Sequence, residues 1–89
     1  MEAVITVVGK DMVGILAKVS GKCAEANVNV EEVTQSILKD TFAMIMLVEI
    51  SKCNIDFTAF AKELTNAGAS MGVDIHVTRQ ELFDAMHRI

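Results

Sequence analysis

The sequence contains no tryptophan or tyrosine and only two cysteines, and the cysteine shortage bounds its chemistry first. Cys23 and Cys53 lie far apart in the sequence, without CxxC spacing and without a histidine-rich stretch beside them. Neither a disulfide framework nor a zinc site is therefore indicated. We interpret both as reduced thiols, with Cys23 serving as a small apolar residue on the buried stripe of a helix. We expect no metal and no cofactor.

Groups suited to acid-base or nucleophilic catalysis are also scarce. His76 alternates with apolar residues in a predicted strand and should face its polar side, whereas His87 falls in the last turn of a predicted helix, where it would complement the helix dipole. Glu31 and Glu32 are neighbours on a strand, so their carboxylates point to opposite faces and cannot share a proton. The sequence therefore predicts a protein that is not an enzyme.

Basic residues are few and long apolar runs are absent. Eight Lys and Arg residues stand against twelve Asp and Glu, giving a net charge of -4, and no basic cluster interrupts the acidic background. This balance disfavours nucleic acid as a ligand. The longest apolar run, Phe42 to Val48, is far shorter than the ~18 to 20 residues of a membrane helix, and the N-terminus does not resemble a signal peptide. We expect a cytoplasmic protein that contacts neither nucleic acid nor a membrane.

What the sequence does have is apolar content. Hydrophobic residues make up 52% of 89 residues, and the mean hydropathy is +0.40. A chain of this length forms one domain and buries only about 60 to 65% of the surface that its unfolded form exposes. Some apolar surface should therefore be left for a partner, which predicts an oligomer.

Hydrophobic periodicity predicts the elements of the first half. A β-branched run over residues 3–8 ends at Gly9 and indicates a strand. A helix of about 14 residues should follow, terminated by Asn27. Residues 28–38 suit an edge strand, either regular or bulged, before a tight turn at Lys39-Asp40. The predicted apolar stripe of the helix consists of Met12, Leu16, Val19, Cys23 and Ala26.

The second half continues the alternation of strands and helices. Residues 42–50 carry apolar side chains at both alternating sets, which predicts a central strand covered on both faces. A helical stripe from Phe57 to Met71 follows, with Asp56 as N-cap and Gly72 as terminator. Residues 73–78 alternate as a half-buried strand, and residues 80–89 form a short amphipathic helix introduced by a capping-box spacing.

The element order βαββαβ predicts an α+β fold, a ferredoxin-like two-layer sandwich. Right-handed crossovers place both helices on one face of a four-stranded antiparallel sheet. We therefore assign residues 1–79 to the domain and residues 80–89 to a C-terminal helical extension. The helices leave the other face of the sheet bare.

The turn between the first strand and the first helix, GKDMVGIL, is the candidate site. A helix N-terminus has unpaired N–H groups and a partial positive charge, so a glycine-opened turn there can receive a carboxylate or phosphate. Asp11 as N-cap would place Gly14 at the third helical position, unshielded by a side chain, and Lys10 would add charge. Neither GxxxxGK[ST] nor GxGxxG is present, which disfavours a phosphate. The alternative is structural: Asp11 only caps the helix, and Gly14 permits close packing.

Two motifs resemble the ACT domain, a small-molecule-sensing module of βαββαβ topology. They are G-x-D-x-x-G-I-L at the start of the first helix and Ala26-Asn27-Val28-Asn29-Val30 leading into the second strand. The resemblance covers residues 2–79 and is greatest to short stand-alone ACT proteins of bacteria and archaea. In regulatory ACT domains the first loop and helix start bind an amino-acid effector, usually at a subunit interface. The resemblance implies a ligand site at Gly9, Lys10, Asp11, Met12, Val13 and Gly14.

We therefore expect a non-catalytic regulatory module that binds a small amino acid or related metabolite. No catalytic or DNA-binding domain accompanies it, so it should act in trans on an unidentified protein partner. The alternative is a dimerisation or adaptor module without a small-molecule ligand. An acylphosphatase-like enzyme of the same fold is disfavoured, because its anion cradle requires an arginine near the first loop and the sequence has none there.

The bare sheet face predicts a homodimer. Ile45 and Leu47, with Val4 and Thr6 from the neighbouring central strand, would expose an apolar patch on this face. A second subunit could cover it sheet to sheet, or two subunits could pair along the polar second strand. The helix predicted at residues 80–89, about 15 Å long, is too short to hide the face alone and should lie at the interface or its rim.

Overall fold

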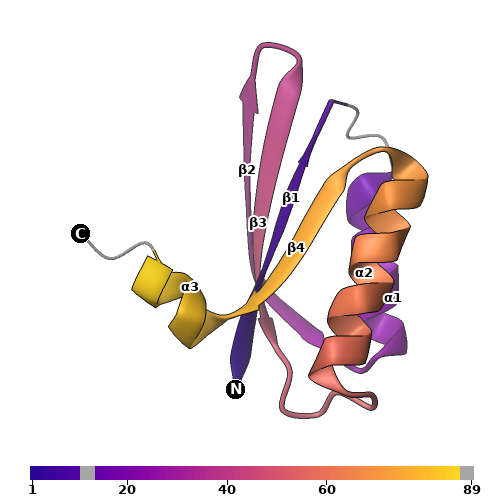
Figure 1. The fold of residues 1–89 in the computed structure, drawn as a ribbon, viewed down its shortest axis with the longest axis vertical. Helices are drawn as coiled ribbons and strands as arrows, with labels where there is room; N and C mark the ends of the chain where they lie inside the picture. The colour runs from indigo at the N-terminus through magenta and orange to yellow at the C-terminus, as the bar shows by residue number, and fades with distance from the viewer. Residues whose placement is uncertain (11–13, 87–89) are drawn as a thin grey trace.

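A four-stranded antiparallel sheet organises the chain, and the computed structural model describes residues 1–10 and 14–86 (Figure 1). The strand order β2-β3-β1-β4 is the one expected of a ferredoxin-like fold, which confirms the predicted fold class. The elements are β1 (Glu2–Gly9), α1 (Ile15–Glu25), β2 (Asn29–Leu38), β3 (Thr41–Glu49), α2 (Phe57–Met71), β4 (Asp74–Arg79) and α3 (Gln80–Met86).

The helices lie on opposite sides of the sheet. Figure 1 shows α1 and α2 side by side on one face and α3 on the other. The core fills the space between the sheet and the pair α1 and α2, where Phe60 and Leu64 of α2 meet Ile5 and Met46 of the central strands. The short helix α3 contacts β1 and β4, so this second face is covered only at that end by the described residues; we call the part that α3 leaves uncovered the helix-free face. None of the described helices is long and apolar enough to cross a bilayer.

The central strand β3 pairs with β1 and β2, as its apolar sequence predicts. One alternating set, Phe42, Met44, Met46 and Val48, is buried under α1 and α2. The other set faces away from these helices, and Ile45 at its centre is 42% exposed. The prediction of a central position is confirmed, but the described part of the chain covers only one face of the strand.

The buried stripe of α1 differs from the predicted one. Ile15, Val19 and Cys23 face the core, while Leu16 is 41% exposed, so its assignment to the stripe was wrong. Ile15 and Leu16 both fit a spacing of three or four from Val19. Only the orientation of the helix against the sheet decides which of the two is buried. Met12 lies outside the described residues.

The ends of both long helices follow the sequence signals. Asn27 (φ 60°) and Gly72 (φ 74°) take left-handed backbone conformations directly after α1 and α2. Asp56 is the N-cap of α2, and its carbonyl accepts a hydrogen bond from Phe60 N at 2.9 Å. The helix α3 begins at Gln80 as predicted, and residues 87–89 of the predicted helix lie outside the described residues.

The edge strand β2 has the bulge that its polar sequence allowed. Pairing with β3 shifts between Val30 and Glu32, which leaves Glu31 unpaired in the ladder. The far end of β2 extends beyond the reach of α1 and α2 (Figure 1). Ile37 is consequently 62% exposed although it belongs to the same face as the buried Phe42.

Candidate functional site

The β1–α1 loop begins at a glycine that packing requires. A Cβ on Gly9 would lie 2.3 Å from Cγ1 of Val73 and 3.5 Å from Phe42 Cε1. Val73 follows the turn at the end of α2, so the end of β1 passes directly beneath this turn. Gly9 therefore has a structural reason, close approach, that the sequence pattern did not reveal.

The loop ends at Gly14, which is the N-cap of α1 and not its third residue. Its φ of 77° lies in the left-handed region, where glycine is favoured, and a Cβ there would meet no atom within 4 Å. The prediction that Asp11 is the N-cap was therefore wrong, because the helix starts four residues later. The left-handed backbone gives a reason for the glycine by itself, and a packing role of Gly14 stays a prediction. Asp11, Met12 and Val13 themselves lie outside the described residues.

The start of α1 has the electrostatic character of an anion site. Gly14 O accepts the first intrahelical hydrogen bond from Lys18 N at 2.9 Å, while the N–H groups of the first turn have no intrahelical acceptor. No side chain of the described residues caps this end, and its first turn contains no acidic residue. Lys10, exposed on the other side of the loop, adds a positive charge. A carboxylate is the group that this arrangement suits.

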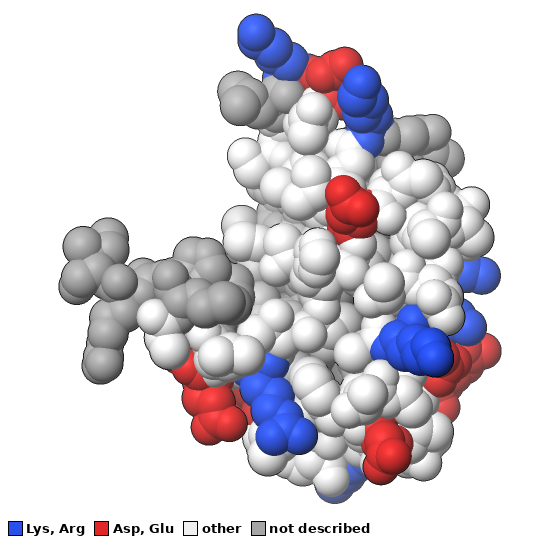
Figure 2. Space-filling view, in the orientation of Figure 1, with Lys and Arg blue, Asp and Glu red and all other residues white. Residues whose placement is uncertain are grey.

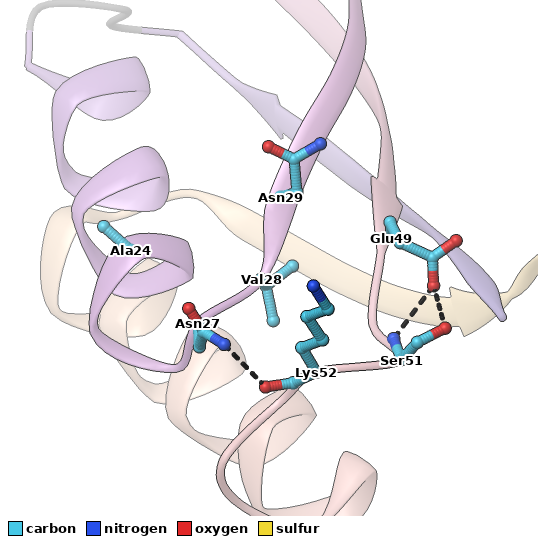
Figure 3. Close-up of a pocket in the computed structure, with 7 residues that line it drawn as sticks. All are labelled: Ala24, Asn27, Val28, Asn29, Glu49, Ser51 and Lys52. Carbon is cyan, nitrogen blue, oxygen red and sulfur yellow. Dashed lines mark hydrogen bonds between the residues drawn. The ribbon is translucent and has the colours of Figure 1, made fainter.

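A cleft lies at the opposite end of the sandwich from the β1–α1 loop, at the connection between α1 and β2. This corner cleft has a volume of about 590 Å³. In Figure 3 the Lys52 side chain extends into the space between Asn29 and Glu49. The cleft is lined by Ala24, Asn27, Val28, Asn29, Glu49, Ser51 and Lys52.

The carboxylate of the corner cleft is already bound by neighbouring groups. The N-terminal ammonium of Met1 lies 2.9 Å from Glu49 Oε1 and donates to Ser51 Oγ at 2.8 Å. The Ser51 hydroxyl and its backbone N–H both donate to Glu49. These hydrogen bonds, led by that of the Ser51 hydroxyl and followed by that of the ammonium, lower the pKa of Glu49 to about 2. No sequence pattern indicated this cluster, because its members come from the start of β1 and the end of β3, which only the antiparallel pairing of these strands brings together.

One carboxylate pairing escaped the sequence analysis. Glu31 is the residue that the bulge leaves unpaired. Its pKa is raised because its side chain hydrogen-bonds Glu2; burial and the charges on Glu2, Glu49 and Glu32 raise it by smaller amounts. Adjacent strand residues do point apart, but the partner of Glu31 lies across the sheet on β1. Glu31 is exposed and Glu2 is half-buried, so this pair lies at the surface.

The remaining titratable residues form no second site in the described part of the chain. His76 is exposed on β4, opposite Thr6 of β1, which agrees with its predicted place on the polar side. His87 lies outside the described residues. No group of three or more His, Cys, Asp or Glu side chains in residues 1–10 and 14–86 is arranged to hold a metal ion. On the face shown in Figure 2, basic and acidic side chains are interspersed.

Two helices on one face of a β2-β3-β1-β4 sheet, with a glycine-bounded β1–α1 loop, define a ferredoxin-like sandwich of the kind used as a small sensing module. A sequence profile of the ACT domain matches residues 2–78. The chain belongs to the ACT-domain family, and the resemblance inferred from the loop and the ANVNV segment is confirmed.

Relatives of the same length occur in bacteria and archaea. The chain is 46% identical to a UPF0237 protein of Listeria innocua over 89 residues, which is 100% of both chains. It is 44% identical to a UPF0237 protein of Methanocaldococcus jannaschii over 86 residues, 97% of this chain and 96% of that one. Among solved structures, an ACT domain protein from Streptococcus pneumoniae is 40% identical with a TM-score of 0.81, covering 98% of each chain.

Proposed function

We propose that this protein is a non-enzymatic regulatory module that binds a small amino acid or related metabolite at the β1–α1 loop. In this proposal the ligand site comprises Gly9, Lys10, Asp11, Met12, Val13 and Gly14. The observation that carries the proposal is the start of α1 directly after Gly14, which no side chain of the described residues caps, with Lys10 on the other side of the loop. Membership of the ACT family supports a regulatory role.

The ligand chemistry follows from the charges around this helix end. The first-turn N–H groups and the helix dipole favour a carboxylate, and Lys10 offers a second positive contact. An amino acid supplies the carboxylate, and its small size suits a loop that glycines bound on both sides. The module would then pass its ligand state to a cytoplasmic protein partner. The Listeria relative is matched along its whole length by this one domain, which supports action in trans.

A thermal-shift screen of the purified protein against the amino acids tests this function. A ligand that binds only the folded state stabilises it by RT ln(1 + [L]/Kd), about 2.7 kcal/mol at a hundredfold excess over Kd. For a domain of this size that corresponds to a rise in Tm of roughly 10 to 20 °C. If no amino acid or related carboxylate raises Tm, the dimerisation or adaptor function replaces the sensor.

Two matched variants locate the ligand. Gly14→Ala places a methyl group in the open space before α1 and should abolish the ligand-induced shift, at a backbone cost of roughly 1 kcal/mol for the left-handed conformation. Asn27→Ala introduces the same kind of strain at the other end of α1 and should keep the full shift. The reverse result, a shift lost only in Asn27→Ala, would move the ligand to the corner cleft and refute the loop assignment.

We also propose that the protein is a homodimer joined through the helix-free sheet face. Cross-strand pairing places Ile45 between Thr34 and Thr6 on this face, and Val8 lies beside Ala43. Ile45 and Val8 are each about two-fifths exposed. Val4, on the same face, is buried near the end that α3 contacts, so α3 covers that end and leaves the centre to a partner.

A second copy suits this surface by its charge. The centre of the face is uncharged, so two copies can meet there without opposing like charges. Pairing along β2 is less favourable because a bulge and two adjacent glutamates interrupt that edge.

Sedimentation equilibrium at micromolar concentration tests the dimer with two matched variants. Ile45→Lys puts a charge at the centre of the proposed interface and should yield the monomer mass of 9.7 kDa. Ile37→Lys alters a more exposed isoleucine on the other face of the sheet and should leave the dimer intact. A wild-type protein that sediments as a monomer would refute the dimer, and dissociation by the Ile37 variant alone would refute this interface.

A further inference from the structure

The fold brings the only two cysteines of the chain to one place. Cys23 lies in the last turn of the 11-residue helix α1, and Cys53 lies in the loop between β3 and α2. Cys23 is 1% exposed and belongs to the hydrophobic core. Cys53 is half-buried and packs against that same core from its edge. Residues that are thirty positions apart in the sequence thus belong to one packed cluster, where the loop closes the end of the sandwich.

Hydrogen bonds fix the two segments to one another on both sides of Cys53. Asn27 Nδ2 donates to the carbonyl oxygen of Lys52 at 2.9 Å. Asn54 donates twice to the end of α1: its backbone N–H to Ala26 O at 2.9 Å, and its side-chain Nδ2 to Glu25 O at 2.9 Å. The residues before and after Cys53 are therefore both bonded to residues 25–27 at the end of α1, which follow Cys23 closely in the sequence.

Cys53 also affects the Cys23 thiol electrostatically. Burial and, to a smaller extent, negative charge on Cys53 together raise the pKa of the Cys23 thiol to about 11. Cys23 is thus a protonated, shielded thiol at neutral pH, and Cys53 is the one that a reagent in solution reaches first. This division is typical of a pair in which one sulfur is oxidised and the other resolves it.

We propose that Cys23 and Cys53 are a site of reversible oxidation, at which a peroxide converts the two thiols into an intrachain disulfide. The Cys53 thiolate attacks one oxygen of hydrogen peroxide; the O–O bond breaks, and the departing oxygen leaves as water after taking a proton. The sulfenic acid formed on Cys53 is then attacked by the Cys23 sulfur, which gives up its proton as the S–S bond forms and a second water departs. Two thiols and one peroxide give one disulfide and two waters, and the two electrons pass from sulfur to oxygen.

The proposed disulfide would act on the corner cleft. Ser51 and Lys52 line the cleft immediately before Cys53, and Asn27 lines it just beyond the end of α1. A covalent link between α1 and the loop would hold these residues at a fixed separation, which the hydrogen bonds alone maintain in the reduced protein. The oxidation state of the pair would thereby set the rigidity of this end of the molecule, away from the β1–α1 loop.

Mass spectrometry of the full chain tests the proposal. Reduced protein is treated with a few equivalents of hydrogen peroxide, denatured, and alkylated with N-ethylmaleimide. The expected product has lost two hydrogens, takes up no maleimide, remains monomeric on a non-reducing gel, and yields a cross-linked peptide pair containing Cys23 and Cys53. Dithiothreitol should restore both alkylation sites.

Two single variants separate the roles of the sulfurs. Cys53→Ser should leave Cys23 largely unreactive toward peroxide in the folded protein, because Cys23 is shielded from solvent. Cys23→Ala should let oxidation of Cys53 proceed to sulfinic acid or to a disulfide between chains. The wild-type peptide map decides the matter even if a variant folds poorly. Wild-type protein that stays unoxidised, forms only interchain disulfides, or carries a sulfinic acid on Cys53 with Cys23 still free would overturn the proposal.

Discussion

The same substitution, glycine to alanine, should have opposite effects in the two long helices. Gly21 lies on the exposed surface of α1, and a Cβ there would meet no atom within 4 Å. Gly68 lies on the buried side of α2, where a Cβ would sit 2.7 Å from Ile75 Cγ1 and 2.9 Å from Val73 O. We expect Gly21→Ala to stabilise the protein and Gly68→Ala to destabilise it.

The magnitudes follow from two competing terms. Replacing glycine by alanine in a helix interior stabilises the helix by about 0.5 to 1 kcal/mol. At Gly21 nothing opposes this gain. At Gly68 the added methyl overpacks the contact between α2 and β4, which costs about 1 to 3 kcal/mol. The Ile75 side chain can rotate away, but Val73 O is backbone, held close because Val73 N donates to Gly68 O at 2.9 Å. The clash term therefore wins, for a net loss of about 1 kcal/mol.

Urea unfolding followed by circular dichroism measures both changes against the wild type. All three proteins must be compared at one concentration, because association would couple stability to concentration. Thermal melts should agree, since 1 kcal/mol corresponds to about 4 to 8 °C for a domain of this size. If Gly68→Ala raises stability as much as Gly21→Ala does, the close approach of α2 to β4 is wrong, and so is our account of why a glycine occupies that helix.

Substitutions at two positions test the corner where α1 meets β2. Asn27→Gly keeps the left-handed backbone but removes the hydrogen bond to Lys52 O, so urea unfolding should show that the free energy of unfolding falls by about 1 kcal/mol. Asn27→Ala should lower it by roughly 1 kcal/mol more, because alanine disfavours the left-handed conformation. Equal losses in the two variants would show that the backbone at φ 60° is unstrained. Glu49 has a folded-state pKa of about 2, below its ordinary value of 4.5, so its stabilising effect is complete above pH 4.5 and fades as the pH falls toward 2. Glu49→Gln should therefore flatten the pH dependence of unfolding in that window, and an unchanged acid limb would exclude the contacts with Ser51 and the N-terminal ammonium as its cause.

Local patterns were sufficient for the order and type of the elements. The two periods, two for strands and three to four for helices, separate β1 and β3 from α2 without any knowledge of the fold. Residues that tolerate left-handed geometry, Asn27 and Gly72, end their helices as predicted. The ANVNV and GKDMVG segments were enough to indicate the family. These features depend on neighbours within a turn or two, which the sequence displays directly.

Periodicity alone did not decide which of two adjacent apolar residues is buried. Ile15 and Leu16 both fit the stripe of α1, and the sequence analysis chose the wrong one. The choice depends on the rotation of the helix against the sheet, which is set by packing with β2 and α2. The predicted start of the helix was also wrong. Asp11 is a residue type that favours N-caps, but α1 begins directly after Gly14.

The sequence by itself determined the family, the strand and helix order and the apolar surplus that calls for a partner, because each of these is written in local spacing and composition. Only the tertiary structure decided the contacts between distant segments. It placed Val73 against Gly9, Glu2 against Glu31, and Cys53 against the core residue Cys23. No local pattern encodes such pairs, since each arises from crossover connections that return the chain to the same end of the sheet after 29 residues or more.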